Sequence, residues 1–166
     1  KEGDCMTTKQ KSISKPLACC LFSMRPITCE SLLRFEKAAT SLVEEQGVRR
    51  FYVISEYCDT GYLRILERLS KSVEIELVAV THYTDPNPEW LEERTKDLVP
   101  PFHRVENIDT GTRLLRYRIL RRIKAMLDLS DYCFVNSSEY PLEKSILVHI
   151  KKRLDLTVLD LGEAMA

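Results

Sequence analysis

Short, almost continuously apolar runs alternate with amphipathic stretches along most of this sequence. Leu17–Phe22 is the clearest run, and similar ones occupy 48–54, 75–80, 132–135 and 156–159. A run without polar alternation is typical of a strand that is covered on both faces. Strands that alternate with helices indicate a parallel sheet. We therefore expect a three-layer α/β fold of Rossmann type, with a mostly parallel sheet of about five to seven strands and helices on both faces.

The segments between the runs carry apolar residues at helical spacing. Thr28 can cap a helix that extends to about residue 46, where Gly47 supplies the C-terminal stop. Further helices are expected after Gly61, around 89–97, over 112–129 and from about 141 to 153. The apolar sides expected for two of them are Leu63, Leu66 and Leu69 after Gly61, and Leu115, Ile119, Ile123 and Met126 in 112–129.

The length of 166 residues predicts a single domain. We divide the chain into a polar N-terminal arm (1–15), one domain (16–161) and a short C-terminal tail (162–166). Hydrophobic residues make up 44% and charged residues 30%, which is the mix of an ordinary globular protein.

Charge and apolar-run length exclude two broad classes of partner. Lys and Arg number 25 and Asp and Glu number 25, so the chain lacks the positive excess of a general polyanion binder. A specific nucleic-acid partner is therefore not expected, because any contact would depend on a local patch. No apolar run approaches the roughly 20 residues of a membrane span, so we expect no membrane partner.

The six cysteines show neither CxxC spacing nor a neighbouring pair of histidines. We expect a reduced cytoplasmic protein with no metal and no cofactor, while disulfides or a zinc site remain the alternative.

In a parallel sheet of this kind, ligands bind outside the carboxyl ends of the strands. Helix N-termini point their free N–H groups toward the same place. Three turns should meet at that edge, namely 23–28, 55–60 and 136–140.

Segments at these turns and in the helix of 112–129 match motifs of a known superfamily. They are Phe22-Ser23-Met24-Arg25-Pro26, Gly47-Val48-Arg49-Arg50-Phe51, Ser55-Glu56-Tyr57-Cys58-Asp59-Thr60-Gly61, Trp90 with Arg94, and the basic segment from Arg122 to Asp131. With these segments the chain resembles the SLOG superfamily, the Rossmann-like relatives of Smf/DprA and lonely-guy proteins, in its small bacterial YspA-like branch. The resemblance covers residues 16 to 161.

The resemblance implies a non-enzymatic bacterial protein that binds or senses a nucleotide-derived small molecule at the carboxyl edge of the sheet. Arg25 or Arg122 would balance the negative charge of the ligand. The implied ligand-binding residues are Ser23, Met24, Arg25, Ser55, Glu56, Tyr57, Cys58, Asp59, Arg122, Asn136, Ser137, Ser138 and Glu139.

A second hypothesis is an interaction module for a protein partner. Ser55 and Asp59 stand where the superfamily has glycine, and a Cβ there would fill space that a phosphate needs. Tyr57 and Asp59 would then plug the pocket, and the partner would bind the basic helix or the sheet edge. A third hypothesis is a nucleotide N-glycosidic hydrolase that uses Glu139. A homodimer is compatible with the resemblance, because the superfamily often pairs subunits through helices that flank the sheet.

Three further groups of residues have both a functional and a structural interpretation. The six cations between 113 and 124 form either an anion-binding surface or a solvated helix face. The aromatic residues near the turns stack on a base, form a hydrophobic lid, or fill the mouth of the site where glycines have been lost. His82 follows a strand and is either part of a site loop or a structural or solvated residue. The residues are Arg113, Arg116, Arg118, Arg121, Arg122 and Lys124 among the cations, and Tyr57, Tyr62, Tyr83, Trp90 and Tyr140 among the aromatics.

Overall fold

The computed structural model describes residues 15–22, 28–54, 56, 58–84, 86–98, 101–136 and 148–162. The helices and strands are, in chain order, β1 (Ala18–Phe22), α1 (Cys29–Glu44), β2 (Arg50–Ile54), α2 (Thr60–Ser72), β3 (Glu76–Thr81), α3 (Pro88–Thr95), the 3₁₀ turn η1 (Lys96–Leu98), β4 (Arg104–Asn107), α4 (Leu115–Asp128), β5 (Tyr132–Val135) and β6 (Thr157–Asp160).

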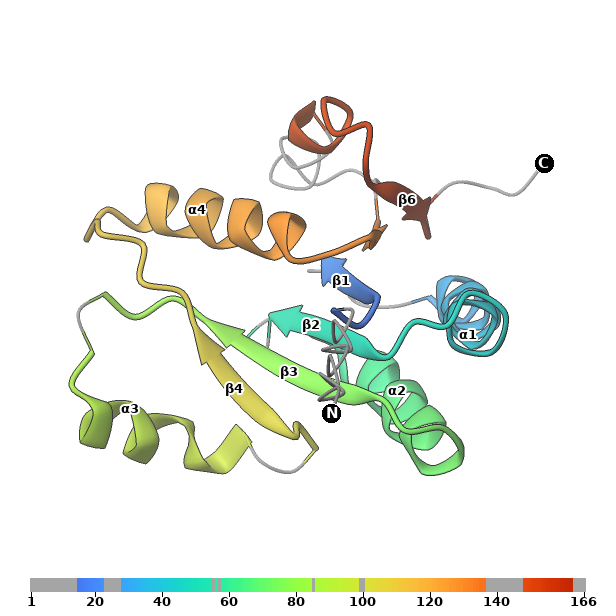
Figure 1. Cartoon of the computed structure of the whole chain (residues 1–166), viewed down its shortest axis with the longest axis horizontal. Helices are drawn as coiled ribbons and strands as arrows, with labels where there is room; N and C mark the ends of the chain where they lie inside the picture. Colours follow the sequence, from blue (N-terminus) through green and yellow to red (C-terminus); the bar gives the residue numbers. More distant parts are fainter. Residues whose placement is uncertain are drawn as a thin grey trace, which may run out of the picture.

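The strands form one six-stranded sheet in the order β4-β3-β2-β1-β5-β6, and all neighbouring strands are parallel (Figure 1). This confirms the predicted α/β fold of Rossmann type. The chain adds β2, β3 and β4 on one side of β1, and α4 then leads to β5 on its other side. All strands therefore end at the same edge, and the direction of winding changes between β1 and β5.

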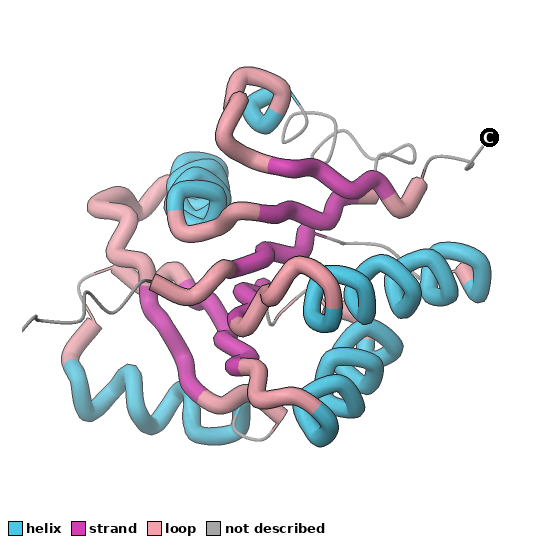
Figure 2. The backbone as a smooth tube through the Cα atoms, turned by 45° about the vertical axis from the view of Figure 1, so that its right-hand side comes forward, coloured by secondary structure: helices cyan, strands magenta, loops and turns pink. Residues whose placement is uncertain are grey.

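Helices cover both faces of the sheet (Figure 2). In β1, Cys19 and Leu21 pack with α1 and α2 on one face, whereas Ala18, Cys20 and Phe22 pack with α4 on the other. Every residue of β1 is buried. This two-sided burial explains the continuous apolar runs in the sequence.

Local capping residues set the beginnings of α1 and α2. The Thr28 hydroxyl accepts a hydrogen bond from the Ser31 N–H at 3.1 Å, as the sequence predicts for this cap. Asp59 does the same for α2, where its carboxylate accepts from the Gly61 N–H at 2.8 Å. After α1, Gly47 has a φ of 77°, a left-handed conformation that favours glycine at the turn into β2.

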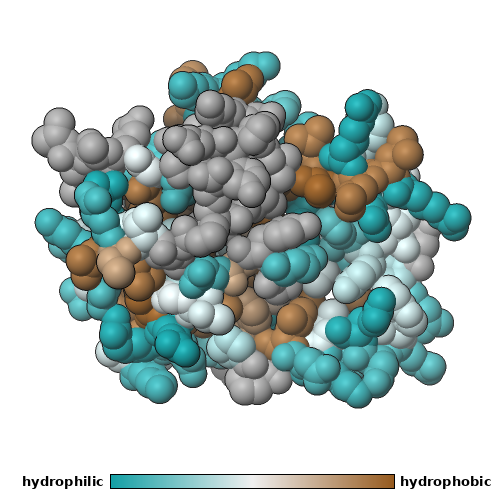
Figure 3. Space-filling model, turned by 180° about the vertical axis from the view of Figure 1, so that it is seen from behind, coloured by the Kyte–Doolittle hydropathy of each residue, from teal (hydrophilic) through white to brown (hydrophobic). Residues whose placement is uncertain are grey.

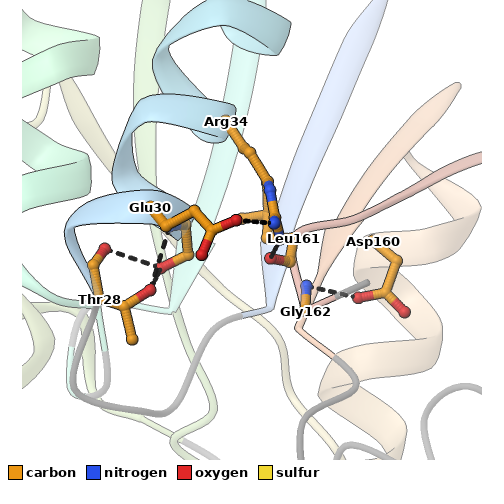
Figure 4. A network of polar contacts seen from close by, with 7 residues as sticks. Thr28, Glu30, Arg34, Asp160, Leu161 and Gly162 are labelled. Atoms are coloured by element: carbon orange, nitrogen blue, oxygen red, sulfur yellow. Dashed lines mark hydrogen bonds and ion pairs between the residues drawn. The ribbon is translucent and has the colours of Figure 1, made fainter. Parts of the chain in front are cut away.

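Polar contacts hold β5 and β6, the two strands on the side of β1 opposite to β2, to the rest of the fold. The Ala18 N–H donates to the Asp131 carboxylate at 3.0 Å, and the Asp131 N–H donates to the Ala18 carbonyl at 2.8 Å. At the end of β6, the Arg34 guanidinium of α1 donates to the Leu161 carbonyl at 3.2 Å and pairs with Glu30 (Figure 4). These contacts connect β5 and β6 to elements from the first quarter of the chain.

The buried stripes of two helices differ from the sequence prediction. In α2, Tyr62 and Ile65 are buried beside Leu66, and the Tyr62 ring packs edge-to-face on Phe35 at 4.6 Å. Tyr62 therefore belongs to the core and not to a site loop, while Leu63 and Leu69, expected on the inner side, are only partly buried.

In α4, Ile123 and Met126 are buried, but Leu115 is 56% exposed. Residues spaced by four drift by about 40° per step around a helix of 3.6 residues per turn. Two such steps separate Leu115 from Ile123, which carries Leu115 off the buried face.

Several predictions fall outside the described residues. These include the arm before residue 15, the tail after 162 and most of the helix expected over 141–153, of which 148–150 are seen as helical. Among the described helices, none is long and apolar enough to span a bilayer.

Candidate functional site

Five of the residues predicted for the ligand site are described, and they lie at or near the carboxyl ends of the strands. Glu56 follows β2, Cys58 and Asp59 lead into α2, and Asn136 follows β5. Arg122 reaches this edge from α4. The remaining predicted residues, Ser23, Met24, Arg25, Ser55, Tyr57, Ser137, Ser138 and Glu139, lie outside the described residues.

Arg122 is completely buried, with 0% of its surface exposed, and is the largest fully buried side chain among the described residues. It stands three residues after Ile119 and four before Met126, so helical spacing places it on the apolar stripe of α4. The interpretation of the basic helix as a solvated face is therefore wrong for Arg122. It holds for Arg116 and Lys124, which are exposed.

The Arg122 side chain joins α4 to the ends of two strands. Its Nη1 donates to both carboxylate oxygens of Glu56, at 3.0 and 3.1 Å, and lies 3.5 Å from the Val80 carbonyl oxygen in β3. The Glu56 side chain is 41% exposed. The ion pair thus has one partner in the interior and one at the surface.

The other side of the same guanidinium has unused donors. Within the described part of the chain, Nε and Nη2 of Arg122 are buried and have no hydrogen-bond partner. Nε of Arg118 and Nδ1 of His82 are also buried and unpartnered there. Buried polar nitrogens are normally paired, because leaving them unpaired costs about 1–3 kcal/mol each. The unpartnered nitrogens on Arg122, Arg118 and His82 make this cluster the candidate site for a hydrogen-bond acceptor.

The charges of both arginines act on the pKa of His82. Burial lowers the pKa of His82, and the positive charges of Arg122 and Arg118 lower it further, while Glu56 acts in the opposite direction. The imidazole is thus held neutral near pH 7. A neutral imidazole can accept or donate one hydrogen bond at Nδ1, depending on its tautomer.

The segment that carries His82 is fixed by Asn107 at the end of β4. The Asn107 side chain accepts hydrogen bonds from the Thr81 hydroxyl at 2.9 Å and the Tyr83 N–H at 2.7 Å, and donates to the Tyr83 carbonyl at 2.8 Å. Sequence reasoning missed Asn107, which is the last residue of the short strand β4. This contact fixes the backbone on both sides of His82.

The other described site residues have structural partners. Asp59 uses its carboxylate to cap α2. Burial, and to a lesser extent the charge of Asp59, raise the pKa of the Cys58 thiol to about 12. Cys58 is therefore a neutral thiol near pH 7 and a poor nucleophile. Asn136 is buried.

The described residues were searched for metal-binding groups and for surface grooves. No group of three His, Cys, Asp or Glu side chains in the described ranges is arranged to hold a metal ion. Three surface grooves lie elsewhere: one between α4 and residues 149–153, one between α1 and β6, and one at the amino ends of β2 and β3.

Two pairs of aromatic and cationic residues lie near the carboxyl edge. The Tyr83 and Trp90 rings meet edge-to-face at 5.0 Å, and the Arg94 guanidinium lies 5.4 Å from the centre of the Trp90 ring. Arg94 of the same helix thus covers one side of the Trp90 ring, although a large part of the Trp90 surface is exposed.

The sequence was compared with models of known protein families and with curated proteins. No family model matches the chain, and no curated protein matches it. The arrangement of Arg122, Glu56, Arg118 and His82 is therefore the basis for assigning a function.

Proposed function

We propose that this chain is a non-enzymatic binding protein of SLOG type that holds a nucleotide-derived small molecule at the carboxyl edge of the sheet. The observation that supports this proposal is the buried guanidinium of Arg122, which is anchored on Glu56 through Nη1 and whose nitrogens Nε and Nη2 have no hydrogen-bond partner among the described residues. Those two nitrogens form the recognition element of the site.

The geometry of a guanidinium explains why this edge suits a phosphate. Nε–H and one N–H of Nη2 point the same way from a planar group, and their spacing matches two oxygens of a phosphate or carboxylate. Because Glu56 holds the opposite part of the group, the free edge is already oriented before a ligand arrives. Arg118 and His82 carry further unpartnered nitrogens, and both arginines lie near enough to His82 for their charges to lower its pKa.

The proposal assigns no reaction to the chain. A phosphate held by Arg122 would need a nucleophile or a general base beside it for hydrolysis. Cys58 is protonated near pH 7, and Glu56 is engaged by Arg122. These observations favour binding over turnover.

We further propose that the protein acts in the bacterial cytoplasm. The described cysteines, Cys19, Cys20, Cys29, Cys58 and Cys133, are all free thiols, as a reducing compartment requires.

Calorimetric titration of the full chain with AMP and with ADP-ribose tests the proposed function. We expect micromolar or tighter binding of at least one of these compounds. Arg122→Lys keeps the positive charge but loses the two parallel donors of the guanidinium. The affinity of this variant for the ligand should therefore fall at least about tenfold. Lys124→Gln removes an exposed charge from the same helix and should leave the affinity within about twofold.

Two results would refute the proposed function. One is the absence of binding for both compounds. The other is an unchanged affinity in Arg122→Lys, provided that circular dichroism shows the variant to be folded. Release of a base or sugar during the titration, detected by chromatography, would instead show that the chain is an enzyme.

A further inference from the structure

The groove between α4 and residues 149–153 contains a cavity of about 280 Å³ with an apolar floor, here called the α4 cavity. Leu120, Ile123 and Leu127 line it, and their spacing of three and four residues places them on one face of α4. Ile123 and Leu127 also belong to the buried core, whereas Leu120 is only partly buried. Seen from behind (Figure 3), the part of the molecule that carries α4, at the upper right, shows apolar surface bordered by hydrophilic residues.

The wall of the cavity opposite α4 is held in place by packing and by polar contacts. Ile150 is buried in the same core cluster as Ile123 and Leu127. Arg153 forms an ion pair with Asp128 at the end of α4, and its N–H donates to the Ile150 carbonyl at 2.8 Å. Both walls of the α4 cavity are therefore part of the packed fold.

Basic side chains surround the apolar floor. The described lining of the α4 cavity contains no acidic side chain, and its basic members are Arg121, Lys124, His149 and Arg153. A hollow with apolar walls and charges of one sign at its border attracts a ligand of the opposite charge. The lining therefore favours an anion that also carries an apolar part.

Two of these cations have no counter-charge among the described residues. Arg153 is already paired with two carboxylates. Within the described ranges the other ion pair of α4 is that of Arg122, so neither Arg121 nor Lys124 is neutralised there. Arg121 donates to the Thr110 carbonyl, which is an uncharged group. Both charges thus remain available to a ligand at the border of the cavity.

We propose that the α4 cavity binds a small carboxylate with an apolar body, of the class of a medium-chain fatty acid. The apolar chain would lie on Leu120, Ile123 and Leu127, where it leaves water. The carboxylate would lie at the border, between Arg121 and Lys124. Arg122 is not among the described residues that line this cavity, so the inference does not rest on the nucleotide site proposed above.

A medium-chain carboxylate fits this cavity better than a nucleotide or a nucleic acid. The volume of about 280 Å³ lies just below the roughly 300–1,000 Å³ that is usual for sites of drug-sized ligands. A base and a ribose would place several hydrogen-bonding groups on a floor of leucine and isoleucine, where those groups would stay unpaired. A nucleic acid is too large to enter, so the apolar floor would contribute nothing to its binding.

Calorimetric titration of the full chain with sodium octanoate tests the proposal. We expect a dissociation constant below about 1 mM, as suits a ligand with few non-hydrogen atoms. Burial of one methylene tightens binding about fourfold, so hexanoate should bind at least about tenfold more weakly than octanoate. The uncharged 1-octanol should bind at least about fivefold more weakly, because it lacks the attraction to Arg121 and Lys124.

Two variants locate the binding site. Lys124→Glu reverses a charge at the border and should lower the affinity for octanoate at least about fivefold. Its matched control, Lys71→Glu, changes an exposed lysine of α2 and should leave the affinity within about twofold. Leu120→Trp fills the cavity without a change of charge and should abolish binding. AMP at 1 mM should leave the affinity for octanoate unchanged.

Four results would overturn the proposal. They are no binding of octanoate up to about 5 mM, equal affinity for octanoate and 1-octanol, unchanged affinity in either cavity variant when circular dichroism shows it to be folded, and displacement of octanoate by AMP. The last result would place octanoate at the Arg122 cluster. Failure of AMP to bind would count against the proposed function alone. Sedimentation of the chain with phosphatidylglycerol vesicles, without binding of free octanoate, would assign the surface to a lipid bilayer instead.

Discussion

The ion pair between Arg122 and Glu56 predicts an asymmetric response to mutation. Arg122 is fully buried, whereas the Glu56 side chain is 41% exposed. Glu56→Ala therefore strands a positive charge in the interior, with the Val80 carbonyl oxygen at 3.5 Å as its remaining described acceptor. Arg122→Met leaves a carboxylate that already contacts water, and fills the interior with an apolar side chain of similar length.

Breaking a buried pair by removing one partner costs about 3–5 kcal/mol of unfolding free energy. Water can enter the space left by the half-exposed glutamate, so we expect about 2–4 kcal/mol for Glu56→Ala. We expect a change of no more than about 1 kcal/mol for Arg122→Met, because replacing a buried charge by an apolar group is often neutral or stabilising. When Glu56→Ala is added to Arg122→Met, it should lower the free energy of unfolding by only about 0.5 kcal/mol or less, since no buried charge remains.

Urea unfolding followed by far-UV circular dichroism measures the four proteins of this cycle. For a chain of this size, the loss in Glu56→Ala corresponds to a melting temperature about 5–15 °C lower. Glu56→Gln keeps an acceptor oxygen and should retain part of the stability. The reasoning is refuted if Arg122→Met is the more damaging single change, or if Glu56→Ala costs the same whether or not Arg122 is present.

Three further predictions concern single residues. Asp59→Ala removes the N-cap of α2 and should lower the unfolding free energy by about 1 kcal/mol, while Asp59→Asn should lower it by much less; urea unfolding compares the two. The pKa of His82 is lowered in the folded protein from the ordinary 6.5, so stability present above pH 6.5 should be lost as pH falls below it. Urea unfolding from pH 5 to 8 should show this loss, and His82→Gln should reduce it; a steeper loss in the variant would contradict the assignment. Burial raises the pKa of the Cys58 thiol to about 12, so iodoacetamide at pH 8 should label the exposed Cys29 well before Cys58. Peptide mass spectrometry measures the two labelling rates, and faster labelling of Cys58 would be inconsistent with its burial.

The sequence predicted the architecture because burial leaves a strong local pattern. Strands covered on both faces require apolar residues at every position, as in β1, and this pattern also indicated that the sheet is parallel. Thr28 and Gly47 marked the two ends of α1 through cap chemistry that involves only neighbouring residues. These elements depend on short-range properties, so a single sequence is enough to find them.

The candidate site was only partly predictable, because its contacts join residues far apart in the chain. Glu56 was predicted from its place after a strand, and Arg122 from its motif. Their ion pair connects residues 66 positions apart and depends on where α4 crosses the sheet. The burial of Arg122 could have been found from its spacing to Ile119 and Met126. Its charge favoured the opposite interpretation, since arginine is rarely fully buried.

The two hydrogen bonds between Ala18 and Asp131 bear on the order in which the strands of the sheet assemble. The strands β1 to β4 can associate in the order in which they are synthesised, each beside its predecessor. The second edge of β1 is completed only when Asp131 arrives, 113 residues later, and exchanges two hydrogen bonds with Ala18. Closing so long a loop is slow compared with local pairing. Although β1 is an inner strand of the finished sheet, it is thus an edge strand for much of the folding process. The amides on this edge remain open to exchange with solvent until β5, from the C-terminal third of the chain, has docked.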